Sequence, residues 1–326
     1  MLEDTFGRQH NYLRISLTDN CNLRCFYCMP EEDYAFAPAA KLMQPHEIET
    51  LAKLFVDNGV TKIRLTGGEP LVRKDAPKII ELLGNLGVDL HMTTNGVRIH
   101  EMLPQIIAAN IKGINVSLDT LQPDKFERIT RRDLYHRVRS NIELLLHHEI
   151  PTKINVVIMK GLNENEILDF VALTKNYALE VRFIEFMPFA GNKWTGNQVF
   201  TLAEILETVR AKYDFVPIAP EANHTAKGFL VPGHKGTFAV ISTMSSPFCE
   251  GCNRLRLTAD GKLKNCLFSK SETDLLSALR QGENVLPLIE QTVKAKAKAL
   301  GGQFEANGAE SDAAHIENRS MITIGG

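Results

Sequence analysis

Three cysteines stand at close, regular spacing in the stretch Cys21-Asn-Leu-Arg-Cys25-Phe-Tyr-Cys28. When the backbone forms a loop, this spacing lets the three thiols converge on one centre. Thiolates are strong ligands for iron–sulfur clusters and for zinc, and both centres usually take four protein ligands. A [4Fe–4S] cube held by three cysteines would keep one iron open for chemistry. A structural zinc site, or three ordinary buried cysteines, is the alternative interpretation.

A second group of three cysteines lies toward the C-terminal end of the sequence. Its members are Cys249, Cys252 and Cys266. Asp260-Gly261 is typical of a hairpin turn, which would bring the third cysteine back to the first two. This group also lacks one ligand, and the shared deficit favours a second open cluster. Zinc remains an alternative, because His224 or His234 could supply the fourth ligand.

Two arginines, Arg254 and Arg256, directly follow the first two cysteines of this second group. A guanidinium group offers fixed, paired donors that match the geometry of a phosphate. We therefore expect a phosphate-bearing ligand beside the second group. For either arginine taken alone, a solvated strand face is a competing interpretation.

The elements that must position these residues alternate between strand and helix. Period-two apolar patterns predict six strands, and 3.6-residue patterns predict helical segments between and after them. The expected strands cover residues 12–18, 62–66, 88–94, 113–118, 153–159 and 179–187. The expected helices cover about 44–58, 75–86, 99–110, 123–148, 164–177 and 202–212. Six alternating units predict a parallel sheet.

One face of these strands carries polar side chains, which is unusual for a parallel sheet. They are Arg14, Arg64, Thr66, His91, Thr93, Asn115, Ser117, Lys153 and Asn155. A polar interior indicates a wide lumen that holds a polar ligand, and six units rather than eight fit a partial barrel. Arg182 and Met187 are five residues apart, so a regular sixth strand cannot point both inward. A bulge, or one outward residue, is expected there.

Composition limits the remaining choices. The chain has 326 residues and a net charge of −2, which indicates roughly two domains and no general affinity for nucleic acid. We expect a barrel domain over residues 1–215 and a smaller α+β domain over residues 216–326. No apolar run reaches the ~18 residues of a membrane span, and the N-terminus lacks signal-peptide features. A cytoplasmic protein is expected, in which clustered cysteines indicate metal binding or catalysis.

Several motifs together carry a resemblance to one family over essentially the whole length. They are Cys21-x-x-x-Cys25-x-x-Cys28, Arg64-Leu-Thr-Gly-Gly68-Glu-Pro-Leu, Thr93-Thr-Asn-Gly, Ile-Asn-Val-Ser117-Leu-Asp, Lys153-Ile-Asn-Val, Arg182-Phe-Ile-Glu-Phe-Met187, Cys249-Glu-Gly-Cys252-Asn-Arg254-Leu-Arg256, Cys266-Leu-Phe and the terminal Gly325-Gly326. The first motif resembles the radical S-adenosylmethionine (SAM) signature. The whole set resembles the GTP 3′,8-cyclase family of molybdenum cofactor biosynthesis. Arg131-Arg132 departs from the family, which usually has glycine in this region.

The resemblance implies a fold and a set of site residues. The fold would be α/β, a TIM-like partial (β/α)6 barrel of the radical SAM type with a smaller C-terminal α+β domain. Cys21, Cys25 and Cys28 would hold one [4Fe–4S] cluster, and Cys249, Cys252 and Cys266 a second. Tyr27, Gly68, Ser117 and Met187 would contact SAM. GTP would contact Arg14, Arg64, Thr93, Lys153, Arg254, Leu255 and Arg256, with Arg182, Gly325 and Gly326 as further candidates.

The implied activity is a lyase reaction that converts GTP to (8S)-3′,8-cyclo-7,8-dihydroguanosine 5′-triphosphate, an early step of molybdenum cofactor (molybdopterin) biosynthesis. The cofactors would be two [4Fe–4S] clusters and SAM. Cleavage of SAM would give a radical that takes hydrogen from C3′ of GTP, after which C3′ bonds to C8 of guanine. The implied partners are GTP, an external electron donor and the next pathway enzyme, cyclic pyranopterin monophosphate synthase. Neither nucleic acid nor membrane is expected as a partner, and a homodimer is a further expectation.

Two other functions fit parts of the sequence. A peptide-modifying radical SAM enzyme would also carry an auxiliary cluster, although such enzymes usually have more C-terminal cysteines than the three found here. A zinc-stabilised module or an electron carrier would use the cysteines without any substrate. Such a module would not need a lumen lined by cationic and hydroxyl groups, and this favours the enzyme.

Overall fold

The chain folds around one continuous sheet. The computed structural model describes residues 1–29, 34–220, 223–303 and 317–325, and twelve strands within these ranges pair side by side. Their order is β12-β11-β10-β1-β2-β3-β4-β5-β6-β9-β8-β7. Strands from the C-terminal third of the chain therefore flank the first six on both sides.

Six parallel strands in sequence order form the middle of the sheet. They are β1 (Tyr12–Ser16), β2 (Lys62–Thr66), β3 (Asp89–Thr94), β4 (Gly113–Ser117), β5 (Thr152–Ile158) and β6 (Glu180–Glu185). Each pairs in parallel with the next. The predicted six-stranded parallel sheet is confirmed.

Helices follow these strands along the chain. They are α1 (Pro45–Asp57), α2 (Ala76–Gly84), α3 (Ile99–Ala108), α4 (Pro123–Thr130), α5 (Tyr135–His147), α6 (Ile167–Asn176) and α7 (Leu202–Arg210). Gln44 and Glu47 form a capping box at the start of α1. Pro45, the first residue of the helix, has no N–H group and so leaves no donor unpaired there. The helical pattern expected across about 123–148 corresponds to two helices, α4 and α5. Arg131 ends α4 with a φ of 56°, a left-handed conformation that suits glycine better than arginine.

The C-terminal segment adds strands to both edges of the six-stranded middle. Its elements are β7 (Val216–Pro217), β8 (Lys227–Leu230), β9 (Thr237–Ile241), β10 (Arg254–Leu257), β11 (Lys262–Lys264), β12 (Thr273–Asp274), α8 (Leu275–Arg280), α9 (Leu286–Lys294) and α10 (Met321–Ile324). β9 runs parallel to β6, and β10 runs parallel to β1. The C-terminal part thus extends the sheet of the barrel. The boundary between residues 215 and 216 remains a prediction.

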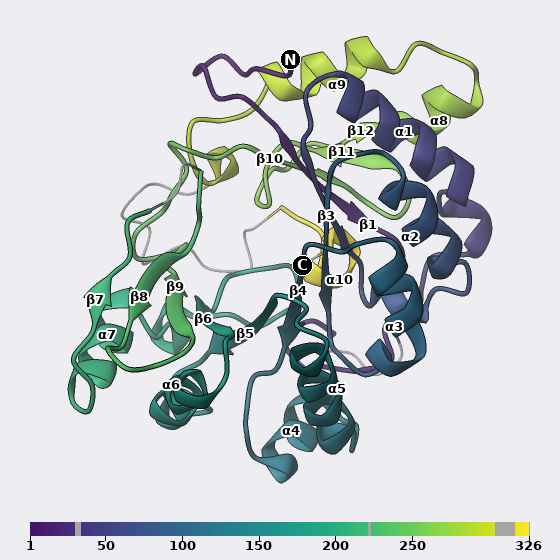
Figure 1. Cartoon of the computed structure of the whole chain (residues 1–326). Helices are drawn as coiled ribbons and strands as arrows, with labels where there is room; N and C mark the ends of the chain where they lie inside the picture. The colour runs from purple at the N-terminus through teal and green to yellow at the C-terminus, as the bar shows by residue number, and fades with distance from the viewer. Residues whose placement is uncertain (30–33, 221–222, 304–316, 326) are drawn as a thin grey trace.

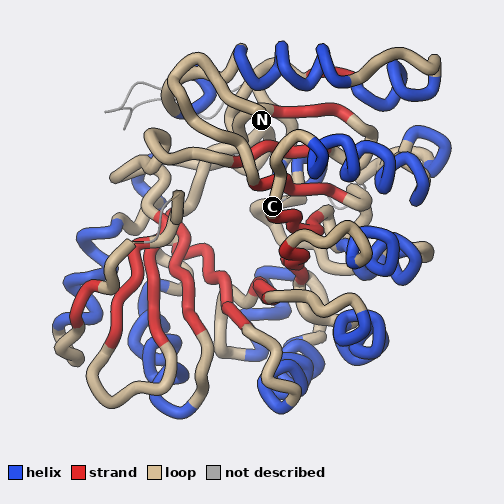
Figure 2. Tube along the Cα trace, turned by 45° about the horizontal axis from the view of Figure 1, so that its top comes forward, coloured by secondary structure: helices blue, strands red, loops and turns tan. Residues whose placement is uncertain are grey.

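The sheet curves around the end of the chain. Helices α1 to α6 lie along its outer side, and α10 lies among the strands on the inner side (Figure 1). Figure 2 shows the C-terminus between the two arms of the curved sheet. The inner side is therefore where the chain end meets the polar faces of the strands.

The outer faces of the strands form the apolar core. Leu13 and Ile15 of β1 and Leu65 of β2 are fully buried in it. Successive side chains of a strand point to opposite faces, so Arg14 and Arg64 point to the inner side. The predicted polar lumen follows from this alternation.

The sixth strand is shorter than expected. β6 ends at Glu185, and Met187 lies in the loop that follows. Alternation of side chains holds only within a strand, so no bulge is needed to bring Arg182 and Met187 to the same side. The expected extension of this strand to residue 187 is wrong by two residues.

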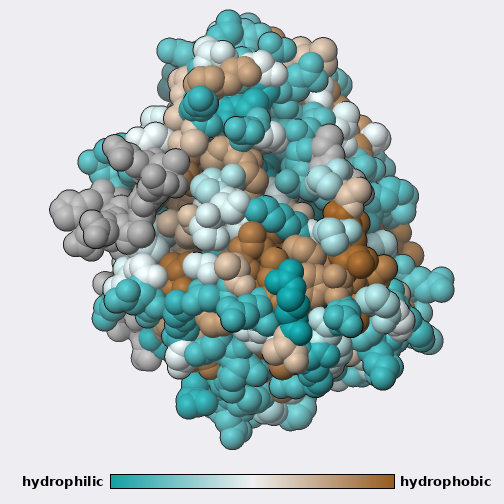
Figure 3. Space-filling view, turned by 90° about the vertical axis from the view of Figure 1, so that its left-hand side faces the viewer, coloured by the Kyte–Doolittle hydropathy of each residue, from teal (hydrophilic) through white to brown (hydrophobic). Residues whose placement is uncertain are grey.

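The surface is of the mixed kind that folded proteins usually show. On the face in Figure 3, hydrophobic residues gather in a central band with hydrophilic residues above and below. In the ranges that the structure describes, no helix combines the length and the apolar character that crossing a bilayer requires.

Glu185, at the end of β6, ties three segments together. Its carboxylate accepts hydrogen bonds from the backbone N–H groups of Leu202 (2.9 Å), Met244 (2.8 Å) and Ser245 (2.9 Å), and from the Ser245 hydroxyl. The side chain is fully buried. One carboxylate thus fixes β6, the start of α7 and the loop after β9 to one another.

Replacing Glu185 with alanine should lower the free energy of unfolding by about 3 kcal/mol or more, because each buried N–H group left unpaired costs about 1–3 kcal/mol. Urea denaturation followed by circular dichroism measures this change. Glu207→Ala, at an exposed position of α7, is the matched control and should cost less than about 0.5 kcal/mol. Equal losses in the two variants would contradict the role assigned to Glu185.

Candidate active site

Three adjoining cavities occupy the inner side of the sheet. The first has a volume of about 190 Å³, the second about 170 Å³ and the third about 300 Å³. The first and second share the lining residues Thr93, Asn155, Ile184, Met187 and Met321. The second and third share Arg14, Asn115, Arg182, Thr225 and Arg254. Cavities with common walls form one elongated interior site.

All three cysteines of the N-terminal loop line the first cavity. Backbone hydrogen bonds hold this loop from two sides. The N–H of Arg24 donates to the carbonyl of Thr130 at the end of α4 (2.8 Å), and the N–H of Gly68 donates to the carbonyl of Thr18 (2.7 Å). The loop after β1 is thus fixed to the turn after β2 and to α4, which places the thiols at the carboxyl ends of the strands.

The three cysteines of this group are half-buried, and loss of water around the thiols favours their protonated form in the absence of a metal. Burial raises the pKa of Cys21 to about 11 and raises the pKa values of Cys25 and Cys28 well above their usual range. The Cys21 sulfur accepts hydrogen bonds from the N–H of Leu23 (3.4 Å) and the side-chain amide of Asn95 (3.7 Å). Binding a cluster would release the protons, and amide donors to sulfur are a usual environment for cluster ligands. The donor set fits an iron–sulfur cluster.

The residues predicted to contact SAM all line the first cavity. They are Tyr27, Gly68, Ser117 and Met187. The Tyr27 hydroxyl donates to one oxygen of Asp119 (2.5 Å), and the other oxygen accepts from the N–H of Val157 (2.9 Å). Burial raises the pKa of Asp119 to about 6. This pair fixes the tyrosine at the cavity wall.

Glu69, next to Gly68, is a buried carboxylate that was not among the predicted site residues. Its two oxygens accept from the N–H of Leu71 (3.0 Å), the hydroxyl of Thr94 (2.8 Å) and the N–H of Asn95 (2.6 Å). Burial raises its pKa to about 7. The carboxylate ties the turn after β2 to the end of β3, so it supports the wall that Gly68 forms.

All three cysteines of the second group line the second cavity, and the β10–β11 hairpin returns the third cysteine to the other two as predicted. The Lys296 ammonium donates to the sulfur of Cys252 (3.3 Å), and the N–H of Leu300 donates to the sulfur of Cys249 (3.4 Å). Burial raises the pKa of Cys252, but the charges of Arg254 and Lys296 bring it down to about 6. This thiol is therefore largely a thiolate near neutral pH, as a metal ligand must be.

The two histidines that could have completed a zinc site lie elsewhere. His224 lines the third cavity, and the ring of His234 contacts the Thr174 hydroxyl (2.8 Å) and the ring of Tyr213. Among the residues that the structure describes, no three His, Cys, Asp or Glu side chains gather closely enough to hold a single metal ion. Neither histidine lines the second cavity with the three thiols.

Most residues predicted to contact GTP line the second and third cavities. Those on the second are Arg14, Thr93, Arg182, Arg254 and Arg256. Those on the third are Arg14, Arg64, Lys153, Arg182 and Arg254. Lys62, His91 and Lys112 add further polar groups to the third cavity. This concentration of positive charge suits a polyanion such as a triphosphate. Lys62 has the same strand parity as Arg64, so the sequence contained a signal for it that was not used.

Some lumen groups are already paired within the protein, and others are not. Arg64 donates to the Tyr12 hydroxyl (2.6 Å) and to the carbonyl of Met92 (2.8 Å). In contrast, Nε of Arg14 and Oδ1 of Asn155 are buried and have no hydrogen-bond partner among the described residues. Unpaired buried polar atoms are costly, and a polar ligand in the lumen would satisfy them.

Leu255 and the chain end need separate comment. The Leu255 side chain is fully buried in the core, so only its backbone faces the site. The carbonyl of Gly325 accepts a hydrogen bond from Arg256 (2.5 Å), and a Cβ at this glycine would lie 2.5 Å from the Thr66 hydroxyl oxygen. With a φ of 84°, the position suits glycine alone. Gly326 lies outside the described residues.

Comparison with known proteins agrees with this arrangement. The Radical SAM superfamily model matches residues 15–174, and the Molybdenum Cofactor Synthesis C model matches residues 179–301. Molybdenum cofactor biosynthesis protein 1 of Homo sapiens is 48% identical over 99% of this chain and 51% of its own length. GTP 3′,8-cyclase, mitochondrial, of Arabidopsis thaliana is 46% identical over 100% of this chain and 84% of its length. GTP 3′,8-cyclase of Rhodopirellula baltica is 40% identical over 100% of this chain and 92% of its own length.

Solved structures share the fold at low sequence identity. The crystal structure of Streptococcus suis SuiB covers 90% of this chain and 67% of its own, with a TM-score of 0.60 and 16% identity. The structure of the same protein bound to S-adenosylmethionine covers 83% of this chain and 65% of its own, with a TM-score of 0.59 and 17% identity. At such identities the likeness concerns the fold alone.

The partial parallel barrel and the three-cysteine loop after its first strand define a radical SAM protein, a class that works with SAM and an iron–sulfur cluster. The two cyclase relatives are matched along most of their length. The chain belongs to the GTP 3′,8-cyclase family of molybdenum cofactor biosynthesis. It spans about half the length of the mammalian relatives, 51% of each. The predicted family and fold class are confirmed, while the individual ligand contacts remain predictions.

The packing at Gly68 gives a test of the first cavity. A Cβ added there would lie 2.5 Å from the carbonyl oxygens of Asp19 and Asn20, and backbone cannot move aside as a side chain can. Gly68→Ala should therefore shift the turn away from the cysteine loop and weaken SAM binding about tenfold or more, which corresponds to about 1.4 kcal/mol. Equilibrium binding of SAM to anaerobically prepared protein measures it.

Gly228→Ala is the matched control for this substitution. An added Cβ would meet its nearest neighbour there at an ordinary 3.4 Å. Its SAM affinity should equal that of the unchanged chain. If Gly68→Ala also binds SAM as tightly as the unchanged chain, the turn does not shape the SAM site.

Proposed function

We propose that this chain is a radical SAM lyase that converts GTP to (8S)-3′,8-cyclo-7,8-dihydroguanosine 5′-triphosphate, an early step of molybdenum cofactor biosynthesis. One observation carries the proposal. Two cavities, each lined by three free cysteines, share a wall, and the second is also lined by arginines of β1 and β10. A reaction that passes from SAM to a nucleotide needs two such adjoining compartments. The names of the plant and bacterial relatives, both GTP 3′,8-cyclases, support the same substrate.

Two [4Fe–4S] clusters and SAM are the proposed cofactors. Cys21, Cys25 and Cys28 would hold one cluster, and Cys249, Cys252 and Cys266 the other. When bound, the first cluster and SAM supply a carbon radical able to take hydrogen from a ribose C–H bond. The protein's own task is to bind both reactants, orient them and exclude water.

On the SAM side, the residues of the first cavity shape a close-fitting wall. Gly68 has no Cβ, so the backbone carbonyls of Asp19 and Asn20 in the cysteine loop can pack directly against it. Ser117 ends β4 with a hydroxyl at the cavity, and Tyr27 is held there by Asp119. Met187 lies on the wall that the first and second cavities share. These residues would hold SAM with its reactive end toward the second cavity.

On the GTP side, the arginines are positioned before the ligand arrives. Arg14 of β1 lies directly opposite Arg256 of β10 in the sheet. Burial, together with the charges of Arg14 and Arg254, lowers the pKa of Arg256 well below its usual range. Like charges this crowded repel one another until a polyanion neutralises them. The triphosphate of GTP is the proposed counter-charge, and it would set the nucleotide's position relative to SAM.

The remaining parts of the proposal concern the setting of the enzyme. The enzyme would work in the cytoplasm and receive electrons from an external donor. Its product would pass to cyclic pyranopterin monophosphate synthase. Gly325 and Gly326 would form the narrow end of a tail beside GTP. A homodimer is also proposed.

The proposed activity is tested by anaerobic incubation of the chain with SAM, a reductant and GTP, followed by mass spectrometry of the nucleotide. The cyclised product is an isomer of GTP. When [3′-²H]GTP is the substrate, a product with the mass of unlabelled GTP, together with deuterium in the released 5′-deoxyadenosine, supports the cyclase. Release of 5′-deoxyadenosine without any change in GTP would contradict the substrate but not the class.

The two cysteine groups should differ in what their loss does. Cys25→Ala should abolish SAM cleavage and halve the iron content from about eight to about four atoms per chain, as loss of one four-iron cluster requires. Cys252→Ala should lose a similar amount of iron and all cyclisation, yet keep some SAM cleavage. Iron and sulfide analysis with a 5′-deoxyadenosine assay distinguishes them. Full cyclisation by Cys252→Ala would remove the second group from the substrate site.

Arg254 should contribute directly to GTP affinity, because it lines both the second and the third cavity. A charge-assisted hydrogen bond contributes roughly 1.5–3 kcal/mol, so Arg254→Ala should weaken GTP binding by about one to two decades. Equilibrium dialysis with GTP measures the change. Arg137→Ala, at an exposed position of α5, is the control and should bind normally. Unchanged affinity in Arg254→Ala would exclude that residue from the site.

A further inference from the structure

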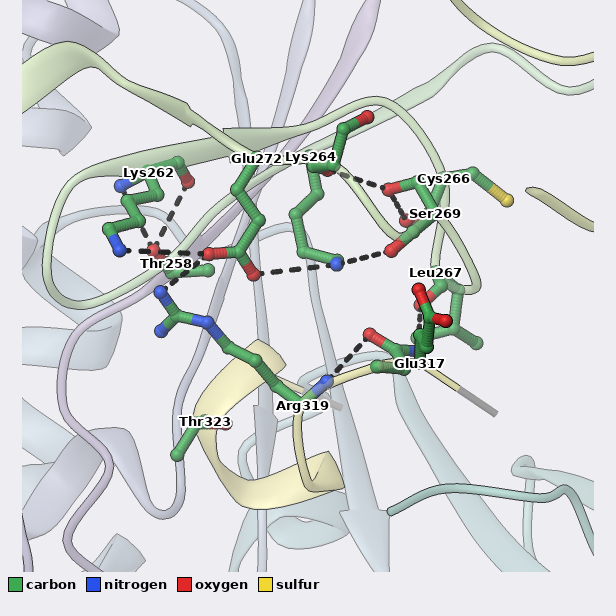
Figure 4. Close-up of polar contacts among 12 residues, drawn as sticks. Thr258, Lys262, Lys264, Cys266, Leu267, Ser269, Glu272, Glu317, Arg319 and Thr323 are labelled. Carbon is green, nitrogen blue, oxygen red and sulfur yellow. Dashed lines mark hydrogen bonds and ion pairs between the residues drawn. The ribbon is translucent and has the colours of Figure 1, made fainter. Parts of the chain in front are cut away.

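Arg319, at the start of the last described segment, is held by two carboxylates of the β10–β12 region. Its guanidinium donates twice to Asp260, at 2.9 Å to each oxygen, and lies 2.6 Å from Glu272. Figure 4 shows the side chain reaching from the tail toward the β11 hairpin. We call Arg319, Asp260 and Glu272 the Arg319 latch. A two-pronged guanidinium–carboxylate contact fixes orientation as well as distance.

The latch continues into the loop that carries Cys266. Glu272 also pairs with the ammonium of Lys264 (3.4 Å), which donates in turn to the carbonyl of Ser269 (2.7 Å). The Ser269 hydroxyl donates to the carbonyl of Cys266 (3.1 Å). Lys264 is almost completely buried, so this chain of contacts runs inside the protein (Figure 4). Glu272 thus contacts the tail directly and the loop of the second cysteine group through Lys264.

A neighbouring tail residue bonds to the same loop from another side. The side-chain amide of Asn318 donates to the carbonyl of Leu267 (2.8 Å). Together with the latch, it fixes the start of the tail on both sides of Cys266. Residues 304–316, just before the tail, lie outside the described part. Gln303 also contacts the start of the tail, where its side-chain amide exchanges hydrogen bonds with the backbone carbonyl (3.3 Å) and N–H (3.2 Å) of Glu317.

The other end of the tail forms part of the two-cavity wall. Met321 lines both the first and the second cavity, and Ile322 lines the first. Ile324 packs in a small apolar cluster with Phe268, and the Gly325 carbonyl accepts from Arg256. The short helix α10 connects these contacts to the latch. The contacts of Arg319 with Asp260 and Glu272 therefore also fix the position of α10 in the wall between the cavities.

We propose that Arg319 is a positioning residue, whose latch seats α10 as the partition between the first and second cavities and couples that seating to the Cys266 loop. The proposal rests on the proposed function as far as catalysis is concerned. Its structural part concerns the resting protein alone. The residue touches neither cavity and therefore acts only through the tail.

A nearby ion pair provides the matched control. Lys270 and Glu317 also join the tail to the Cys266 region at 3.2 Å, but their side chains are 53% and 72% exposed. The side chains of Arg319, Asp260 and Glu272 are 24%, 26% and 14% exposed. Exposed pairs contribute little because water and salt screen them. Lys270→Ala should therefore leave the tail seated.

Hydrogen exchange of the full-length chain measures the seating without substrate or turnover. In Arg319→Met, the amides of residues 321–325 should exchange about tenfold faster or more, while those of β1 to β6 should not change. Arg319→Lys, which keeps the charge but loses the two-pronged contact, should fall between. Asp260→Asn should resemble Arg319→Met. Tail exchange in Arg319→Met that equals that of Lys270→Ala overturns the latch.

Catalytic coupling supplies the second measurement. We expect Arg319→Met to form severalfold less cyclised product per 5′-deoxyadenosine released, with iron content unchanged, and Arg319→Lys to recover part of the ratio. An unchanged ratio in a variant whose tail exchanges faster would overturn the positioning role. If the unchanged chain itself makes no cyclised nucleotide, the proposed function has failed. The exchange experiment still decides whether the latch seats the tail.

Discussion

The pairing of β10 with β1 is the constraint on which the rest of the site depends. It sets Arg254 opposite Tyr12 and Arg256 opposite Arg14, although the two strands lie near opposite ends of the chain. Side chains alternate between the faces of a strand, so a shift of one residue would turn both arginines into the apolar core and Leu255 into the lumen. The same register brings the second cysteine group, which flanks β10, to the inner side of the barrel. One strand pair thus joins the two halves of the site.

This arrangement gathers more positive charge than the protein neutralises. Among the described residues, Glu180 contacts Lys153 and Arg182, Tyr12 contacts Arg64, and Asp89 lines the third cavity. Burial raises the pKa of Tyr12, yet the charges of Arg14 and Arg64 bring it down to about 7. These perturbed groups indicate a site that the folded chain holds under electrostatic stress. A bound polyanion would relieve that stress, and the binding free energy gained could then position the ligand.

Strand periodicity accounts for the part of the site that could be predicted from sequence. Alternation placed Arg14 and Arg64 on the inner face, and the structure puts both at the lumen. The same alternation predicts that Lys62, two residues before Arg64, also points to the inner face, and it does line the third cavity. Contacts made between irregular segments left no such signal: Lys296 follows α9, and Arg319 lies in the tail. Periodicity alone does not locate the break between α4 and α5, because Arg131 adopts a left-handed backbone conformation that arginine rarely takes.

The tail explains why the two cavities are neighbours and yet distinct. Their common wall includes two thioether side chains, Met187 from the loop after β6 and Met321 from α10. Methionine is apolar and adaptable, so these two side chains can adjust to molecules of different shape on either side of the wall. α10 is a short helix outside the sheet, so no strand ladder holds it in place. Polar contacts hold α10 at both ends: the Arg319 latch precedes it, and the hydrogen bond from Arg256 to the carbonyl of Gly325 follows it.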